Sequence, residues 1–141
     1  MSRIYWDSML FIYWLENHPV FAKRVAKIHS RMQERQDLLI TGTFTFGEVL
    51  AGAYRRGMPR VADETRGLLL SVISEVVPLT IEAASHYARI RGTLGIAPAD
   101  AVHLACAAHA GTDLFLTNDK ALVGKTIPGI QFIGGLDSNI I

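Results

Sequence analysis

The hydrophobic residues follow two spacings along the chain, and each change of spacing separates a predicted strand from a predicted helix. Short runs of branched and aromatic residues predict strands at about 3–6, 38–41, 75–79, 113–117 and 130–133. Between these runs the hydrophobic residues recur every three or four positions, as they do along one face of a helix. This alternation predicts a single α/β domain over residues 1–141, with helices packed on a mostly parallel sheet.

Polar residues and prolines indicate where the helices begin. Asp7 or Ser8 can cap the first helix, and Pro19 is expected to open the second. Thr43 or Thr45 is expected to cap the helix that follows the second strand. Further helices are expected at about 61–73, 80–94 and 98–109, with a short helical turn after position 118.

The composition narrows the class of protein. The only cysteine, Cys106, rules out an internal disulfide and a cysteine-based zinc site. A net charge of +1 gives no overall basic bias toward nucleic acid, so such a contact would need a local patch. No apolar run approaches the roughly 20 residues that span a bilayer, and the chain does not begin with a signal-peptide pattern. We therefore expect a cytoplasmic protein that makes no membrane contact.

Four acidic residues are expected at one edge of the predicted sheet. Asp7 and Asp119 follow the first and fourth strands, and ligands of parallel sheets bind beyond such strand ends. Glu48 and Asp100 lie near the starts of helices that begin at the same edge. Clustered carboxylates repel one another unless a cation is present, and hard oxygen ligands suit Mg²⁺ or Mn²⁺. The pattern predicts metal-assisted hydrolysis of a phosphodiester.

Each acid also has a local explanation. Asp7 could be only a helix cap, and Asp100 could only favour the positive end of a helix dipole. Glu48 could face solvent, and Asp119 could be a turn residue. His103 follows Asp100 by three positions and could be a base or ligand, although a structural, hydrogen-bonded histidine is the favoured interpretation.

The chain resembles the PIN-domain family, and within it the VapC-type toxins of bacterial toxin–antitoxin pairs. The four matching segments are Ile4-Tyr5-Trp6-Asp7-Ser8, Thr45-Phe46-Gly47-Glu48-Val49-Leu50, Pro98-Ala99-Asp100-Ala101-Val102-His103-Leu104-Ala105 and Asp113-Leu114-Phe115-Leu116-Thr117-Asn118-Asp119. The resemblance implies a three-layer α/β/α sandwich around a parallel sheet of about five strands. It also implies an RNA-cutting activity that depends on Mg²⁺ or Mn²⁺, a homodimer, and a cognate antitoxin as partner.

The resemblance assigns roles to individual residues of this chain. Asp7 and Asp100 match direct metal ligands, and Glu48 and Asp119 would complete the shell, partly through waters. Ser8 and Thr117 match positions where a hydroxyl supports the site. One departure is Met9, because the family often has a small polar residue there. A different rate or substrate preference could follow from it.

Two other functions compete with the ribonuclease hypothesis. A phosphatase or phosphotransferase could use Asp7 as a covalent nucleophile, although Ser8 and Met9 do not supply the second acid that such chemistry commonly needs. A non-catalytic module could bind RNA or protein with the same fold. Surplus apolar residues on the helices at about 44–56 and 61–73 could form a dimer face or a partner groove. Three arginines at 55, 56 and 60 could contact phosphate or an acidic partner.

Overall fold

A computed structural model describes residues 1–137 and contains one five-stranded sheet in which every neighbouring pair is parallel. The strands are β1 (Arg3–Trp6), β2 (Leu38–Gly42), β3 (Glu75–Val77), β4 (Thr112–Leu116) and β5 (Ile130–Gly134). Their spatial order is β3-β2-β1-β4-β5, so β1 lies at the centre. The predicted parallel sheet of about five strands is therefore confirmed.

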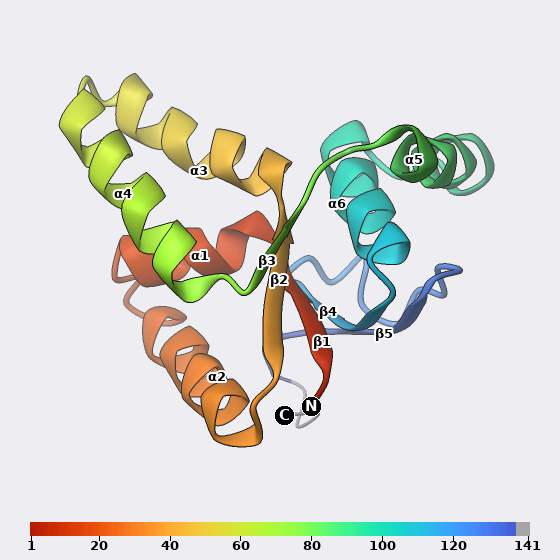
Figure 1. Ribbon diagram of the computed structural model, residues 1–141, viewed down its shortest axis with the longest axis horizontal. Helices are drawn as coiled ribbons and strands as arrows, with labels where there is room; N and C mark the ends of the chain where they lie inside the picture. The colour runs from red at the N-terminus through yellow and green to blue at the C-terminus, as the bar shows by residue number, and fades with distance from the viewer. Residues whose placement is uncertain (138–141) are drawn as a thin grey trace.

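Within residues 1–137, six helices cover the two faces of this sheet (Figure 1). They are α1 (Ser8–Leu15), α2 (Ala22–Arg35), α3 (Thr43–Arg55), α4 (Pro59–Val72), α5 (Ile81–Leu94) and α6 (Pro98–His109). In Figure 1, α1 to α4 lie on one side of the sheet and α5 and α6 on the other. The arrangement is the expected α/β/α sandwich of three layers.

Alternate strand residues supply two separate hydrophobic cores, because successive side chains of a strand point to opposite faces. The register places corresponding residues of β1, β2 and β4 side by side, with Ile4, Leu39 and Leu114 in one row and Tyr5, Ile40 and Phe115 in the next. The first row packs among residues of α1, α2, α3 and α4, and the second packs against α5 and α6. Burial on both faces accounts for the high apolar content of the chain.

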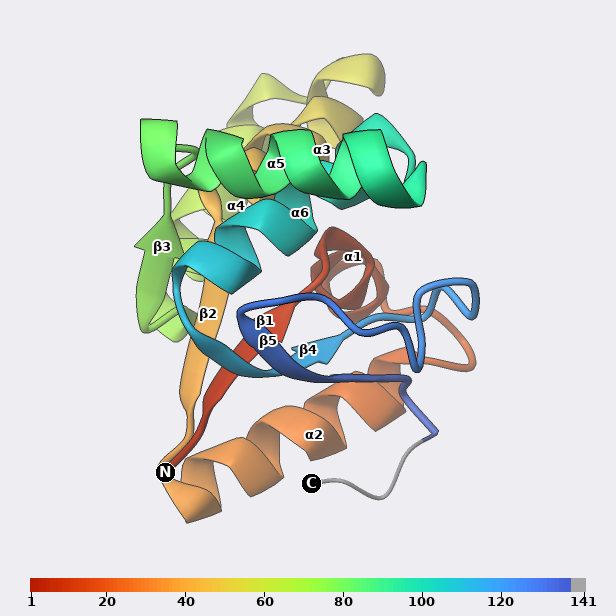
Figure 2. The same cartoon turned by 90° about the vertical axis from the view of Figure 1, so that its right-hand side faces the viewer.

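The strand order changes direction beside β1. From β1 the chain moves outward through β2 to β3, and its helices cover one face; it then returns to β4 through α5 and α6 on the opposite face. In Figure 2, β1 runs from the N-terminus to the end of the sheet where α1 begins. Ligands of such sheets bind where the order reverses, at the carboxyl ends of the strands. Here that position lies between β1 and β4.

Three local predictions are wrong. The second helix begins at Ala22 after a turn, so Pro19 does not open it. Neither Thr43 nor Thr45 caps α3: its N-cap is Gly42, and the buried Thr45 hydroxyl is 2.7 Å from that of Thr41. The segment after Asn118 forms turns and no helix, because its i→i+3 hydrogen bonds, from the N–H groups of Leu122 and Lys125, are isolated and not consecutive.

The described residues contain no helix that is both long enough and apolar enough to cross a membrane.

Candidate metal centre

The four predicted acids line one cavity of about 290 Å³, together with Ser8, Met9, Tyr13, His103 and Asn118. Asp7 follows β1, and Asp119 follows β4 after a short connection. Glu48 lies on α3 and Asp100 in the first turn of α6, so all four elements bring an acid to the same place. The cavity lies at the carboxyl ends of β1 and β4, where the strand order reverses.

Asp7 is the most firmly held of the four. Its carboxylate is buried, and Oδ1 accepts a 2.8 Å hydrogen bond from the Ser8 N–H at the start of α1. Oδ2 accepts a 2.8 Å bond from the Thr117 hydroxyl, which in turn accepts the N–H of Asp119 at 3.0 Å. Asp7 therefore caps a helix and lines the cavity at once. The hydroxyl of Thr117 ties Asp7 to the loop that carries Asp119.

Glu48 approaches His103 across the cavity. Glu48 Oε1 is 2.5 Å from His103 Nε2, and His103 Nδ1 is 2.9 Å from the Tyr5 hydroxyl. Burial alone would raise the pKa of Glu48, but the hydrogen bond and charge of His103 and a hydrogen bond with Ser8 lower it overall. Glu48 is therefore a carboxylate whose charged form is stabilised by its neighbours.

Asp100 has the opposite electrostatic environment. Burial raises its pKa, and repulsion from Asp7, Asp119 and Glu48 raises it further, while His103 opposes the shift. No hydrogen bond or ion pair within the described part of the chain involves its carboxylate. The carboxylates of Glu48 and Asp100 thus line the same cavity but differ: Glu48 has hydrogen-bond partners in the protein, and Asp100 has none among the described residues.

Asp119 is exposed and belongs to a turn, in which its Oδ1 accepts the Ala121 N–H at 2.9 Å. Asp119 is therefore a turn residue, as its local explanation predicted. The same residue also lines the cavity and raises the pKa of Asp100 by repulsion. Asp119 therefore lies close enough to Asp100 to act on its charge.

The residues of the cavity fit a hydrated divalent cation. Among the described residues, no three His, Cys, Asp or Glu side chains are already arranged to enclose a metal ion. Mg²⁺ commonly keeps several waters and uses only one or two protein carboxylates, so such an enclosure is not required. The repulsion that raises the pKa of Asp100 is the feature that a cation would relieve.

Sequence reasoning missed two residues that line the cavity and undervalued a third. Tyr13 and Asn118 line it and are joined by a 3.0 Å bond from the Asn118 amide to the Tyr13 hydroxyl. Nothing local in the sequence connects these two positions. His103 did have a signal, its spacing of three from Asp100, which places both on one helix face.

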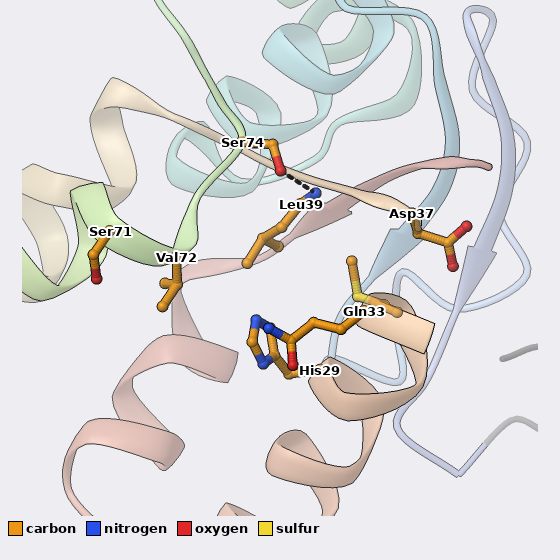
Figure 3. Close-up of a pocket in the computed structure, with 8 residues that line it drawn as sticks. His29, Gln33, Asp37, Leu39, Ser71, Val72 and Ser74 are labelled. Carbon is orange, nitrogen blue, oxygen red and sulfur yellow. Dashed lines mark hydrogen bonds between the residues drawn. The ribbon is translucent and has the colours of Figure 1, made fainter. Parts of the chain in front are cut away.

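A second pocket lies at the opposite end of the sheet and contains none of the four acids (Figure 3). Asp37, which precedes β2, and Ser74, which precedes β3, both line it. The Ser74 hydroxyl accepts the Leu39 N–H at 3.2 Å. Asp37 accepts the Ser2 N–H at 2.8 Å and pairs with Arg35 at 3.3 Å. These contacts join the strand starts to neighbouring segments.

The chain matches the family model of the PIN domain over residues 4–125, and it belongs to that family. This match spans Asp7, Glu48, Asp100 and Asp119 and the two predicted supporting residues, Ser8 and Thr117. No curated protein sequence matches the chain significantly.

Solved structures with the same fold come from toxin–antitoxin systems. The chain superposes on VapBC2 from Rickettsia felis, bound to a DNA fragment from its promoter, with a TM-score of 0.76 at 14% identity, covering 94% of this chain and 98% of that one. VapBC-1 from nontypeable Haemophilus influenzae gives 0.66 at 19% identity, covering 83% and 87%. A toxin–antitoxin complex from Klebsiella pneumoniae gives 0.64 at 20% identity, covering 90% and 94%. These likenesses establish a common fold.

Proposed function

We propose that this PIN-domain protein is a Mg²⁺- or Mn²⁺-dependent endoribonuclease and the toxin of a toxin–antitoxin pair. The observation that carries the proposal is the meeting of Asp7, Glu48, Asp100 and Asp119 in one cavity at the switch point of the sheet. The family match and the VapBC neighbours support the same function.

Some residues of the cavity would bind the cation, and others orient the residues that bind it. Asp100, which has no described protein hydrogen bond, and Asp7 would hold the cation, with Glu48 and Asp119 completing its shell. When bound, a divalent ion supplies positive charge to the phosphate and lowers the pKa of water, so that hydrolysis can proceed at neutral pH. Ser8 and Thr117 keep the Asp7 carboxylate fixed, which limits the reorganisation needed when substrate binds.

The phosphotransferase alternative lacks a residue that it commonly needs. Each oxygen of Asp7 accepts one hydrogen bond and keeps a further lone pair for a cation. A covalent aspartyl mechanism commonly uses a second acid close after the nucleophile, and Ser8 and Met9 occupy those positions.

An RNA cleavage assay tests the proposal. The protein should cut RNA with Mg²⁺ or Mn²⁺ and stop when EDTA is added, and Asp100→Asn should lower the rate by about 100-fold or more, as loss of a group that stabilises transition-state charge does. Asp63→Asn, an exposed acid on α4 outside the cavity, is the matched control and should cut normally. Cleavage that survives both EDTA and a combined Asp7→Asn and Asp100→Asn change would refute the mechanism. RNA binding that ignores EDTA, without any cleavage, would select the binding-module alternative.

We further propose that the antitoxin docks on the apolar groove between α1, α3 and α4. Two adjoining cavities of about 230 and 300 Å³ share Leu15 and Leu68, which are 40% and 56% exposed. Such a groove fits the apolar face of a partner helix. The Arg56–Glu16 ion pair, at 3.0 Å, lies at the wall of the smaller cavity.

A binding assay with a candidate antitoxin, sought among short reading frames next to this gene, tests this surface. Leu68→Asp should weaken the complex, since it places a charge among apolar contacts. Leu70→Asp is the matched control, because Leu70 is 50% exposed on the same helix but lines neither cavity. Equal binding by the two variants would contradict the assignment. The homodimer stays a prediction, which light scattering of the purified protein would test.

A further inference from the structure

His103 lines the acidic cavity, and both of its ring nitrogens lie within hydrogen-bond distance of another side chain. The residue is 2% exposed; its Nε2 lies 2.5 Å from Glu48 Oε1 and 3.8 Å from Asp7 Oδ1. Its Nδ1 lies 2.9 Å from the Tyr5 hydroxyl. Among the residues that line the cavity, His103 is the only one whose side chain can carry a positive charge. With neither nitrogen free, His103 is not placed to act as a general base.

Tyr5 is a rigid anchor for this histidine. It is fully buried in the central strand, and its ring stacks on Phe115 with centroids 5.1 Å apart. Burial raises the pKa of Tyr5, so its hydroxyl stays protonated and able to donate. A Cβ added at Gly42 would lie 2.8 Å from the hydroxyl oxygen, so the backbone closes around this group.

The hydrogen-bond directions follow from these partners. If the Tyr5 hydroxyl donates to Nδ1, the proton of a neutral His103 ring lies on Nε2 and is directed at Glu48. Glu48 is otherwise a 30% exposed side chain on a helix, and such a glutamate normally samples several rotamers. The 2.5 Å contact with His103, together with a hydrogen bond with Ser8, restricts it to one of them.

We propose that Tyr5 and His103 form a positioning relay that fixes the Glu48 carboxylate for cation binding. The inference rests on the proposed metal-dependent function, and it assigns to α6 a second role besides supplying Asp100. His103 is a positioning residue: it acts on the cation through Glu48. Partners that orient metal-binding side chains typically change metal affinity or activity by 10- to 100-fold when they are removed.

A matched pair of substitutions separates the two contacts of His103. Glutamine carries its amide near the position of Nε2, so His103→Gln can still donate to Glu48. Asparagine carries its amide near the position of Nδ1, so His103→Asn can reach Tyr5 but falls short of Glu48. Both substitutions introduce a neutral, polar side chain, so a general folding defect would affect the two variants alike and would not produce a difference between them. Tyr5→Phe removes only the anchoring hydroxyl.

Three readouts on the full chain test the relay. Titration calorimetry with Mn²⁺ alone should show affinity about tenfold weaker in His103→Asn than in wild type, and within about threefold of wild type in His103→Gln. Cleavage rates should follow the same order. In the metal-free protein, ¹H–¹⁵N correlations of the His103 ring should place the proton on Nε2 in wild type, and Tyr5→Phe should shift that signature.

The outcomes distinguish the relay from the function on which it rests. Equal Mn²⁺ affinity in the Asn and Gln variants, in a wild type that binds Mn²⁺ and cuts RNA, overturns the relay and leaves the nuclease intact. A His103 ring protonated on Nδ1 alone also overturns it. A wild type that neither binds Mn²⁺ nor cuts RNA ends the proposed function, and with it the role of the relay in cation binding.

Discussion

Replacing Thr117 by valine isolates the contacts that hold Asp7 in the cavity. The Thr117 hydroxyl, fully buried, donates to Asp7 Oδ2 at 2.8 Å and accepts the Asp119 N–H at 3.0 Å. Valine has nearly the same shape, so both hydrogen bonds are lost without a new cavity. A bond to a carboxylate contributes about 1.5–3 kcal/mol and a neutral one about 1 kcal/mol. We expect the free energy of unfolding to fall by about 3 kcal/mol.

Equilibrium unfolding in urea at pH 7 measures this change. With a slope of about 2 kcal/mol per molar urea, the midpoint should fall by about 1.5 M. Thr112→Val is the matched control, because Thr112 is 1% exposed at the start of β4, the strand that Thr117 follows, and its hydroxyl has no hydrogen-bond partner among the described residues. That variant should be unchanged, or more stable by about 1 kcal/mol. Equal losses in the two variants, or a loss below about 1 kcal/mol for Thr117→Val, would refute the reasoning.

Three further predictions follow from the same structure. Burial and acidic neighbours raise the pKa of Asp100 above its ordinary value of 3.8, so its charged form lowers the free energy of unfolding at neutral pH. Asp100→Asn should therefore stabilise the metal-free protein against urea at pH 7. This gain in stability should vanish as the pH falls through the raised pKa, because the Asp100 carboxyl is then protonated and neutral. Gly42→Ala should destabilise the fold by about 1–3 kcal/mol, since its Cβ would lie 2.8 Å from the Tyr5 hydroxyl, whereas Gly67→Ala in open helical space should stabilise it by about 1 kcal/mol in thermal melts. Burial raises the pKa of Cys106 to about 11, so iodoacetamide at pH 7 should label it only after unfolding, and rapid labelling of the native protein would contradict the buried position.

Local sequence signals failed where a neighbouring residue of the same segment supplied a competing hydrogen bond. Thr45 has the residue type of a helix cap, but its hydroxyl pairs with the buried Thr41, and the backbone of Gly42 begins the helix instead. Pro19 can start a helix, yet His18 Nδ1 accepts the N–H groups of Val20 and Phe21 and holds this segment in a turn. In both cases a side chain only a few positions away, just before the helix, makes the hydrogen bond, so the residue type at one position does not decide where the helix begins.

The alternating hydrophobic spacing determined the strands, the parallel sheet and the edge at which Asp7 and Asp119 emerge. These features follow from the spacing of hydrophobic residues, which can be read along the sequence without knowledge of the fold. The contact of Glu48 with His103, 55 positions away, and of Thr117 with Asp7, 110 positions away, depends on how α3, α6 and β4 pack around β1. Only packing in three dimensions decides which carboxylates receive protein donors and which, like Asp100, are left with their charge uncompensated, because no residue spacing encodes a distance between remote segments.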